Sequence, residues 1–142
     1  MNEAGLIQFH FEDIEFELKY PDRYIQWIQR LVDLHKSSIS EINYVFCSDD
    51  YLLEINKEHL NHDYYTDIIT FPLSKDPIEA DIFISIDRVK DNASTFGLSE
   101  QDELLRVMAH GILHLIGFDD KSDEKQKIMR EKEEEAMTLF SA

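Results

Sequence analysis

The sequence predicts an α+β fold in which a small mixed β-sheet of about four strands packs against helices. Short β-rich runs alternate along the chain with longer runs whose apolar residues recur at helical spacing. One helix, which begins after Ser99 and ends near Gly117, is so broadly apolar that we expect it at the centre of the molecule. With no internal repeat, low-complexity tract or plausible linker, residues 1–142 are expected to form a single domain.

The first third of the chain predicts strands followed by a helix. Leu6–Phe11 alternates well enough for a strand, and Ile14–Leu18 is expected to be a second strand or a continuation of the first. A helix is expected from Pro21, whose fixed φ suits the first helical position, to about Lys36. One stripe of this helix carries Ile25, Ile28, Leu31, Val32 and His35.

The next part of the chain predicts a strand, a helix and a shorter strand. Ile42–Cys47 is a β-rich run. Ser48 or Asp49 is a suitable N-cap for a helix that runs to about Leu60. After it we expect a polar loop at Asn61–Tyr65 and a short strand at Ile68–Phe71, which Pro72 ends.

The remaining elements flank the central helix. Lys75–Glu79 is charged, contains a proline and predicts a turn, Asp81–Ile86 predicts a strand, and about Asp87–Phe96 predicts a helix. The last helix is expected at about Ser122–Phe140, with the Glu131–Glu135 run on a solvated face. The candidates for its packing face are Ile128, Met129, Ala136, Met137 and Leu139.

The helix after Ser99 is the best specified element. Ser99 is a favourable N-cap, and Asp102 stands three residues later, where the acid of a capping box belongs. Gly117 suits the left-handed position that follows a helix and turns the chain back. The residues expected to bury this helix are Leu104, Leu105, Val107, Met108, Ile112, Leu113, Leu115 and Ile116.

Two histidines on this helix indicate a metal site. His110 and His114 are four residues apart, so their imidazoles share one face of the helix and can reach one ion. The acidic pair Asp119-Asp120 follows the turn at Gly117 and can come back toward them. Three protein ligands leave one tetrahedral position open, which is typical of catalytic rather than structural zinc. The alternative is that both histidines are ordinary core residues.

The composition limits the partners that we expect. The formal net charge of −16 argues against broad, non-specific nucleic-acid binding, although a local basic or metal-centred groove is compatible with it. The single cysteine, Cys47, fits a reducing cytoplasm and is expected to be a small core residue. No apolar run approaches ~20 residues, and no secretion signal is recognisable. We therefore expect a cytoplasmic protein with neither a membrane nor DNA as a partner.

The run His110–Asp120 resembles the signature of the YbeY family, which reads His-Gly-x-Leu-His-Leu-x-Gly-Tyr-Asp-His. Upstream, Ile55-Asn56 and Thr66–Pro72 resemble the family's Leu-Asn and Thr-Asp-Val-Leu-Ser-Phe-Pro. Ala80–Ser85 resembles its Gly-Asp-Ile-x-Ile-Ser, and Met129 stands where the family has a Met in its closing helix. The family consists of small bacterial metal-dependent proteins implicated as endoribonucleases in ribosomal RNA maturation and ribosome quality control.

The resemblance implies a zinc-dependent, single-strand-specific endoribonuclease with one Zn²⁺ per chain. It implies ribosomal RNA, the ribosome and ribosomal proteins as partners. It assigns the metal to His110, His114 and Asp120, and leaves Asp119 to hydrogen-bond the turn or orient a histidine. Thr66 and Asp67 begin a strand that in the family runs beside the metal cleft, and we expect them to contact the substrate. No residue can be named as the catalytic base.

Two positions depart from the family pattern. Asp120 stands in place of the family's third histidine ligand; a carboxylate can bind zinc, but it makes the site one charge more negative and must approach more closely. Leu60 stands in place of a family arginine, four residues after Asn56, that is linked to RNA chemistry. The chain therefore lacks, at this position, a planar guanidinium that pairs well with phosphate oxygens. Arg88 and Arg106 are possible replacements for it.

Two other functions stay open at this point. A metallopeptidase-like protein is disfavoured, because Gly111 stands where peptidases of the His-Glu-x-x-His type have their general-base Glu. A weakly active, metal-bearing factor that binds the ribosome is favoured by Leu60 at the arginine position. His59 and His62 lie close to the predicted strand and can approach substrate or a second metal, but loop histidines are more often simply solvated.

Overall fold

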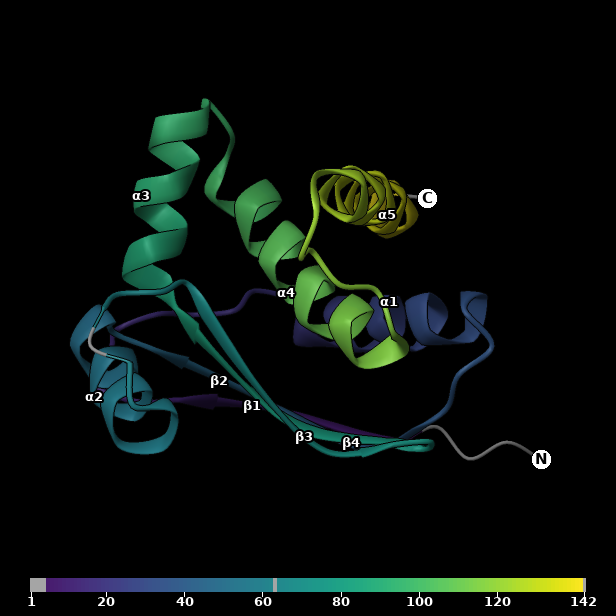
Figure 1. Ribbon diagram of the computed structural model, residues 1–142, viewed down its shortest axis with the longest axis horizontal. Helices are drawn as coiled ribbons and strands as arrows, with labels where there is room; N and C mark the ends of the chain where they lie inside the picture. The colour runs from purple at the N-terminus through teal and green to yellow at the C-terminus, as the bar shows by residue number, and fades with distance from the viewer. Residues whose placement is uncertain (1–4, 63, 142) are drawn as a thin grey trace.

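The computed structural model of the protein describes residues 5–62 and 64–141. Its strands are β1 (Leu6–Phe11), β2 (Ile39–Cys47), β3 (Ile68–Lys75) and β4 (Ile78–Ser85). Its helices are α1 (Pro21–Leu34), α2 (Asp49–Leu60), α3 (Ile86–Phe96), α4 (Glu100–Ile116) and α5 (Asp123–Ser141). The predicted α+β class is confirmed, and so is the mixed sheet (Figure 1).

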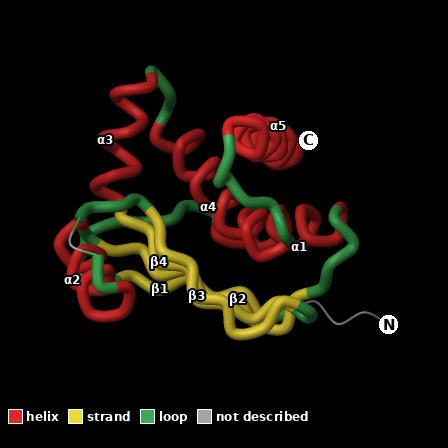
Figure 2. Tube along the Cα trace, viewed as in Figure 1, coloured by secondary structure: helices red, strands yellow, loops and turns green. Residues whose placement is uncertain are grey.

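The sheet has the strand order β1-β2-β4-β3. Strands β1, β2 and β4 are parallel, whereas β3 pairs antiparallel with β4 at one edge. Helices α1, α4 and α5 lie on one side of the sheet, and α4 lies between the strands and α5 (Figures 1 and 2). The side chains that β2 and β4 send toward α4 are fully buried, among them Ile42, Tyr44, Ile82 and Ile84.

The strand predicted at Ile14–Leu18 is not formed, and the segment is an irregular connection between β1 and α1. Its apolar side chains nevertheless point inward: Ile14 and Phe16 pack against the core, and the ring of Phe16 lies 5.5 Å from that of Phe46. Alternating apolar residues indicate that every second side chain is buried. They do not show whether the backbone pairs with a neighbouring strand.

Pro72 does not end β3, contrary to the prediction. The strand continues to Lys75, and Pro72 stands opposite Ala80 with a register irregularity between Pro72 and Ser74. Proline is tolerated here because β3 is an edge strand, so its missing N–H removes no inner ladder hydrogen bond. The hairpin turn is correspondingly shorter than predicted, since β4 begins at Ile78 rather than Asp81.

Helix α4 begins and ends as predicted. The backbone N–H of Asp102 donates to Oγ of Ser99 at 3.0 Å, which is the expected N-cap. Gly117 has a φ of +127°, and its N–H donates to the carbonyl oxygens of Leu113 and His114. A positive φ is accessible to glycine at little cost, so the chain turns back sharply after the helix.

The packing face of α5 differs in part from the prediction. Met129 and Ala136 are buried as expected, but Ile128 is 39% exposed, and the face is completed by Glu133 and Phe140. Glu133 is 3% exposed, so the Glu131–Glu135 run is not wholly a solvated face. The cause is periodicity, because Glu133 lies four residues after Met129 and three before Ala136, on the same side of the helix.

Two further expectations concern Cys47 and membranes. Cys47 is buried, and burial is the main cause that raises the pKa of its thiol to about 12. It packs in a small apolar cluster with Leu52 and Ile69, where α2 meets the sheet, so it is a core residue as predicted. Over residues 5–62 and 64–141, no helix is both long enough and apolar enough to cross a membrane.

Candidate metal centre

His110 and His114 lie side by side near the end of α4. Their Nε2 atoms are 2.9 Å apart, and their rings meet edge to face with centroids 4.4 Å apart. The spacing of four residues places both rings on the same face of the helix, as predicted. Both side chains are partly exposed, so the face opens to solvent rather than into the core.

Asp120 completes a group of three. After the turn at Gly117 its Oδ2 lies 3.8 Å from Nε2 of His110 and 3.8 Å from Nε2 of His114. Asp119 is turned away: its carboxylate accepts from the backbone N–H of Lys121 and the ammonium of Lys125. The turn therefore brings Asp120, and not Asp119, to the two imidazoles.

These three side chains fit a metal ion. Zinc with tetrahedral bonds of ~2.0–2.1 Å holds its ligand atoms about 3.3 Å apart. The observed separations of 2.9 Å and 3.8 Å lie on either side of that value, so small side-chain shifts suffice. Burial and the neighbouring His110 lower the pKa of His114, which favours the neutral imidazole that binds metals.

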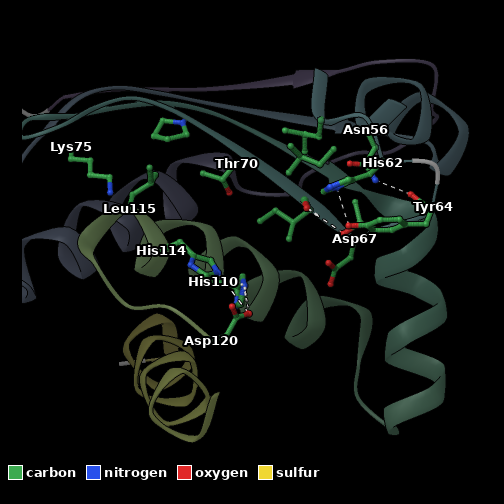
Figure 3. Close-up of a pocket in the computed structure, with 15 residues that line it drawn as sticks. Asn56, His62, Tyr64, Asp67, Thr70, Lys75, His110, His114, Leu115 and Asp120 are labelled. Atoms are coloured by element: carbon green, nitrogen blue, oxygen red, sulfur yellow. Dashed lines mark hydrogen bonds and ion pairs between the residues drawn. The ribbon is translucent and has the colours of Figure 1, made fainter. Parts of the chain in front are cut away.

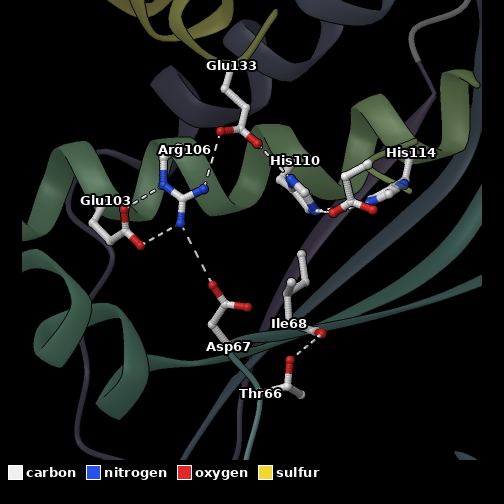
Figure 4. A network of polar contacts seen from close by, with 9 residues as sticks. Thr66, Asp67, Ile68, Glu103, Arg106, His110, His114 and Glu133 are labelled. Atoms are coloured by element: carbon white, nitrogen blue, oxygen red, sulfur yellow. Dashed lines mark hydrogen bonds and ion pairs between the residues drawn. The ribbon is translucent and has the colours of Figure 1, made fainter. Parts of the chain in front are cut away.

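Glu133 forms a hydrogen bond with the Nδ1 side of the His110 ring. Its Oε2 lies 2.6 Å from Nδ1 of His110, so this carboxylate reaches α4 from the last helix (Figure 4). A carboxylate that accepts from Nδ1–H leaves Nε2 as the lone-pair nitrogen and orients the ring toward the metal. The sequence reasoning missed Glu133, although its spacing from Met129 and Ala136 could have revealed it.

Arg106 connects this carboxylate to two others. Its guanidinium forms two hydrogen bonds of 2.7 Å with Glu103 and one of 3.2 Å with Glu133. Its Nη2 also lies 3.8 Å from Oδ2 of Asp67 (Figure 4). Glu103 is fully buried, and the hydrogen bonds to Glu103 are the main cause that raises the pKa of Arg106. Arg106 is therefore committed to three carboxylates and is not a free phosphate ligand.

A cleft of about 570 Å³ lies between α4 and β3, and the metal group forms part of its wall (Figure 3). Thr66 and Asp67 line it as predicted, together with Leu60 at the arginine position. Lys75 is the one Lys or Arg among the described residues that line it. The cleft lining also includes Asn56, His62, Tyr64, Ile68, Ile69, Thr70, Pro72 and Leu115.

The two predicted substrate contacts differ in their surroundings. Oγ1 of Thr66 donates to the carbonyl of Ile68 at 3.4 Å, which is a local contact of the kind that a turn makes by itself. Burial is the main cause that raises the pKa of Asp67, and the positive charge of Arg106 opposes it. Asp67 is thus a cleft carboxyl that takes up a proton more readily than an ordinary aspartate.

The other candidate side chains lie away from this centre. Arg88 pairs with Asp49 and Asp91, so it does not replace the family arginine. His59 packs its ring against Phe71 and does not line the cleft, whereas His62 does.

Gly111 lets α4 approach the sheet closely. A Cβ at this position would lie 3.1 Å from Cδ1 of Ile68 and 3.3 Å from Oγ1 of Thr70. Any larger side chain here would require these neighbouring side chains to shift by a few tenths of an ångström. The position of the general-base Glu of a His-Glu-x-x-His peptidase is thus taken by a glycine that packs closely against the sheet.

Comparison with known proteins shows the family to which the chain belongs. The family model described as endoribonuclease YbeY matches residues 8–141. The chain belongs to the endoribonuclease YbeY family. It is 48% identical to an endoribonuclease YbeY from Flavobacterium psychrophilum, over 95% of this chain and 96% of that protein. It is 50% identical to the one from Cytophaga hutchinsonii, over 94% of each chain.

A solved structure shows the same fold. The solution structure of a Thermotoga maritima protein superimposes with a TM-score of 0.68 at 27% identity, covering 95% of this chain and 89% of that one. The resemblance drawn from His110–Asp120 is thus confirmed over nearly the whole chain. Members of the YbeY family are hydrolases that cut RNA internally, so the expected enzyme class is confirmed too.

The hydrogen bond between Glu133 and His110 is expected to strengthen metal binding. Glu133→Gln is expected to weaken metal binding about tenfold, because the hydrogen bond from His110 Nδ1–H loses its charged acceptor. Competition with a chromophoric chelator measures this affinity. Glu134→Gln, on the exposed side of the same helix, is the matched control and should bind the metal as wild type does. Equal affinities in both variants would mean that Glu133 does not support the site.

Proposed function

We propose that the protein is a zinc-dependent, single-strand-specific endoribonuclease that acts on ribosomal RNA in rRNA maturation and ribosome quality control. One observation carries the proposal: His110, His114 and Asp120 bring three ligand atoms together on the wall of an open cleft. In this proposal each chain holds one Zn²⁺ through these three side chains. The ion supplies Lewis acidity toward a phosphoryl group.

The remaining cleft residues take parts that their positions support. Thr66 and Asp67 contact the substrate from the segment just before β3, where both line the cleft. Glu133 keeps the His110 ring oriented, and Arg106 keeps Glu133 in place. Asp67 lines the cleft, and burial raises the pKa of its carboxyl, so in this proposal it holds a proton there.

The charge of the chain favours a ribosomal setting for this activity. A protein of net charge −16 repels free RNA, because affinity for the phosphate backbone normally comes from Lys and Arg. Among the described residues that line the cleft, Lys75 is the one Lys or Arg, so the rest of the affinity must come from local contacts or from ribosomal proteins. We place the protein in the cytoplasm, which is consistent with its single, buried cysteine.

A second candidate is a metal-bearing factor that binds the ribosome and turns over little RNA. Leu60 favours it, since this residue lines the cleft where the family pattern has an arginine. The two candidates make opposite predictions for chemistry and the same prediction for metal content.

Cleavage of matched RNA substrates tests the proposal. A fragment of ribosomal RNA is presented to zinc-loaded protein either unpaired or annealed to its complement, and products are followed in a single turnover. The proposed enzyme cuts the unpaired strand at least about tenfold faster, and chelation stops it. Equal cutting of both forms contradicts single-strand specificity, and binding without any cutting favours the ribosome-binding factor.

The third ligand can be tested by substitution. Asp120→Ala is expected to weaken zinc binding by about an order of magnitude or more, since two histidines alone bind weakly. Asp120→His should retain or tighten binding, because imidazole is an equally good ligand. Asp119→Ala is the matched control, as its carboxylate faces Lys125. If Asp119→Ala loses zinc and Asp120→Ala retains it, then Asp119 and not Asp120 is the third ligand.

Restoring the missing cation should raise the rate of cleavage. Leu60→Arg places a guanidinium on a cleft-lining position, and stabilising transition-state charge is expected to speed single-turnover cleavage about tenfold. Leu60→Gln, which is polar but uncharged, is the control and should stay near the wild-type rate. An Arg variant no faster than the Gln variant would show that charge at this position does not limit the reaction.

A further inference from the structure

Two aromatic rings at one end of the cleft are stacked on each other. The ring of His62 lies 5.1 Å from the ring of Tyr64, with 21° between their planes. The phenol oxygen of Tyr64 is also 2.9 Å from Nδ1 of His62. Both residues line the same cleft as the metal group (Figure 3). We call His62 and Tyr64 the aromatic platform.

The aromatic platform is anchored to a buried side chain. Asn56 is 2% exposed, and its Nδ2 donates to the backbone carbonyl of Tyr64 at 2.8 Å. Its own backbone carbonyl accepts from the N–H of His62 at 3.1 Å. The backbone of both platform residues is therefore tied to the last turns of α2, while the Tyr64 side chain stays 56% exposed. Tyr64 therefore presents a fixed, exposed aromatic ring to the cleft in which the substrate is proposed to lie.

We propose that the aromatic platform stacks a nucleobase of the RNA strand that lies in the cleft. Every base offers a π-face, and aromatic side chains bind unpaired bases by stacking irrespective of sequence. A base inside a duplex is already stacked on its neighbours, so the platform favours single strands. The proposal rests on the RNA-cleaving function above and adds the group that recognises its substrate.

The charge of the molecule makes this mode of binding appropriate. The cleft lacks the family arginine at Leu60, and Lys75 is the one Lys or Arg among its described lining residues. Arg106 is occupied by carboxylates. Stacking needs no cation and does not release counterions, so it adds affinity where a chain of net charge −16 cannot gain it from phosphates.

Tyr65 provides the matched control. It is 54% exposed, close to the value for Tyr64, but it does not line the cleft, and its hydroxyl donates to Asp50 at 3.3 Å. Substituting either tyrosine removes one exposed ring next to the same loop. Only the loss of Tyr64 should affect a base in the cleft.

The experiment uses zinc-loaded protein and short unpaired RNAs that carry 2-aminopurine at one position, scanned along the strand. Fluorescence quenching during the rapid binding phase reports stacking, and product formation in the same reaction reports cleavage. For wild type we expect one or two adjacent positions to be strongly quenched. Tyr64→Ala and Tyr64→Leu should lose most of this quenching and need about tenfold more protein for half-saturation.

The other variants separate stacking from structure. Tyr64→Phe should keep the quenching, because it retains the ring, and Tyr65→Ala should behave as wild type. Wild-type quenching in both Tyr64→Ala and Tyr64→Leu would overturn the proposal. If stacking is refuted in this way but the wild-type protein still cleaves the RNA, the proposed nuclease function is unaffected. If instead the wild-type protein quenches the fluorescence and forms no product, cleavage is refuted while stacking is supported.

Discussion

His114→Ala is expected to lower the zinc content of purified protein from about one ion per chain to less than about a tenth. The remaining ligands, His110 and Asp120, are too few for tight binding, because zinc in proteins is held by at least three side chains. The variant should also lose RNA cleavage at any RNA concentration. Elemental analysis after dialysis against a mild chelator measures the first effect directly.

His59→Ala controls for the loss of an imidazole as such. His59 packs against Phe71 and does not line the cleft, so this variant should retain about one zinc ion per chain. Full metal content in His114→Ala after the same dialysis would mean that the metal binds elsewhere on the chain.

Arg106→Met is expected to lower the free energy of unfolding by about 3 kcal/mol. It would leave Glu103 and Glu133 without their cation, and these side chains are fully buried and 3% exposed. Removing one partner of a buried ion pair costs ~3–5 kcal/mol, and the partial exposure of Arg106 places this case at the lower end. Urea unfolding followed by circular dichroism measures the change.

Arg88→Met is the matched control. Arg88 also pairs with two carboxylates, but Asp91 is 59% exposed and Asp49 is 19% exposed. Water can take over much of this pairing, so a loss of about 1 kcal/mol or less is expected. Similar losses in the two variants would show that burial of Glu103 and Glu133 does not make Arg106 special.

Most of the fold could be predicted because its signals are local. Helix α4 has a serine cap at its start, an apolar surface and a glycine at its end, and each can be read from neighbouring residues. The errors arose where tertiary position decides the outcome. Whether Pro72 interrupts a strand depends on β3 being an edge strand, and whether Ile14–Leu18 forms a ladder depends on having a strand to pair with.

In the candidate site, too, the residues that are close in sequence were predicted and the residue from another helix was missed. His110, His114 and Asp120 lie within one helix–turn segment, residues 110–120, so their spacing in the sequence was sufficient to predict that they come together. Glu133 reaches His110 from another helix, and a run of glutamates looks like a solvated face until its register against Met129 is considered.

Sequence also could not decide the fate of Arg106, because that depends on the packing of α4 against α5 and β3. The structure surrounds its guanidinium with the carboxylates of Glu103, Glu133 and Asp67. The sequence shows that Arg106 lies close to His110, but it does not show whether the guanidinium is free to bind a phosphate.

We expect RNA cleavage to require one metal ion, held by His110, His114 and Asp120. This requirement is tested by titrating chelated protein with zinc while measuring single-turnover cleavage of an unpaired ribosomal RNA fragment. Activity should be absent without zinc, rise linearly and level off at one equivalent per chain, while His110→Ala stays inactive throughout. Cleavage by the chelated protein, or equal activity in wild type and His110→Ala, would mean that this metal ion is not required for cleavage.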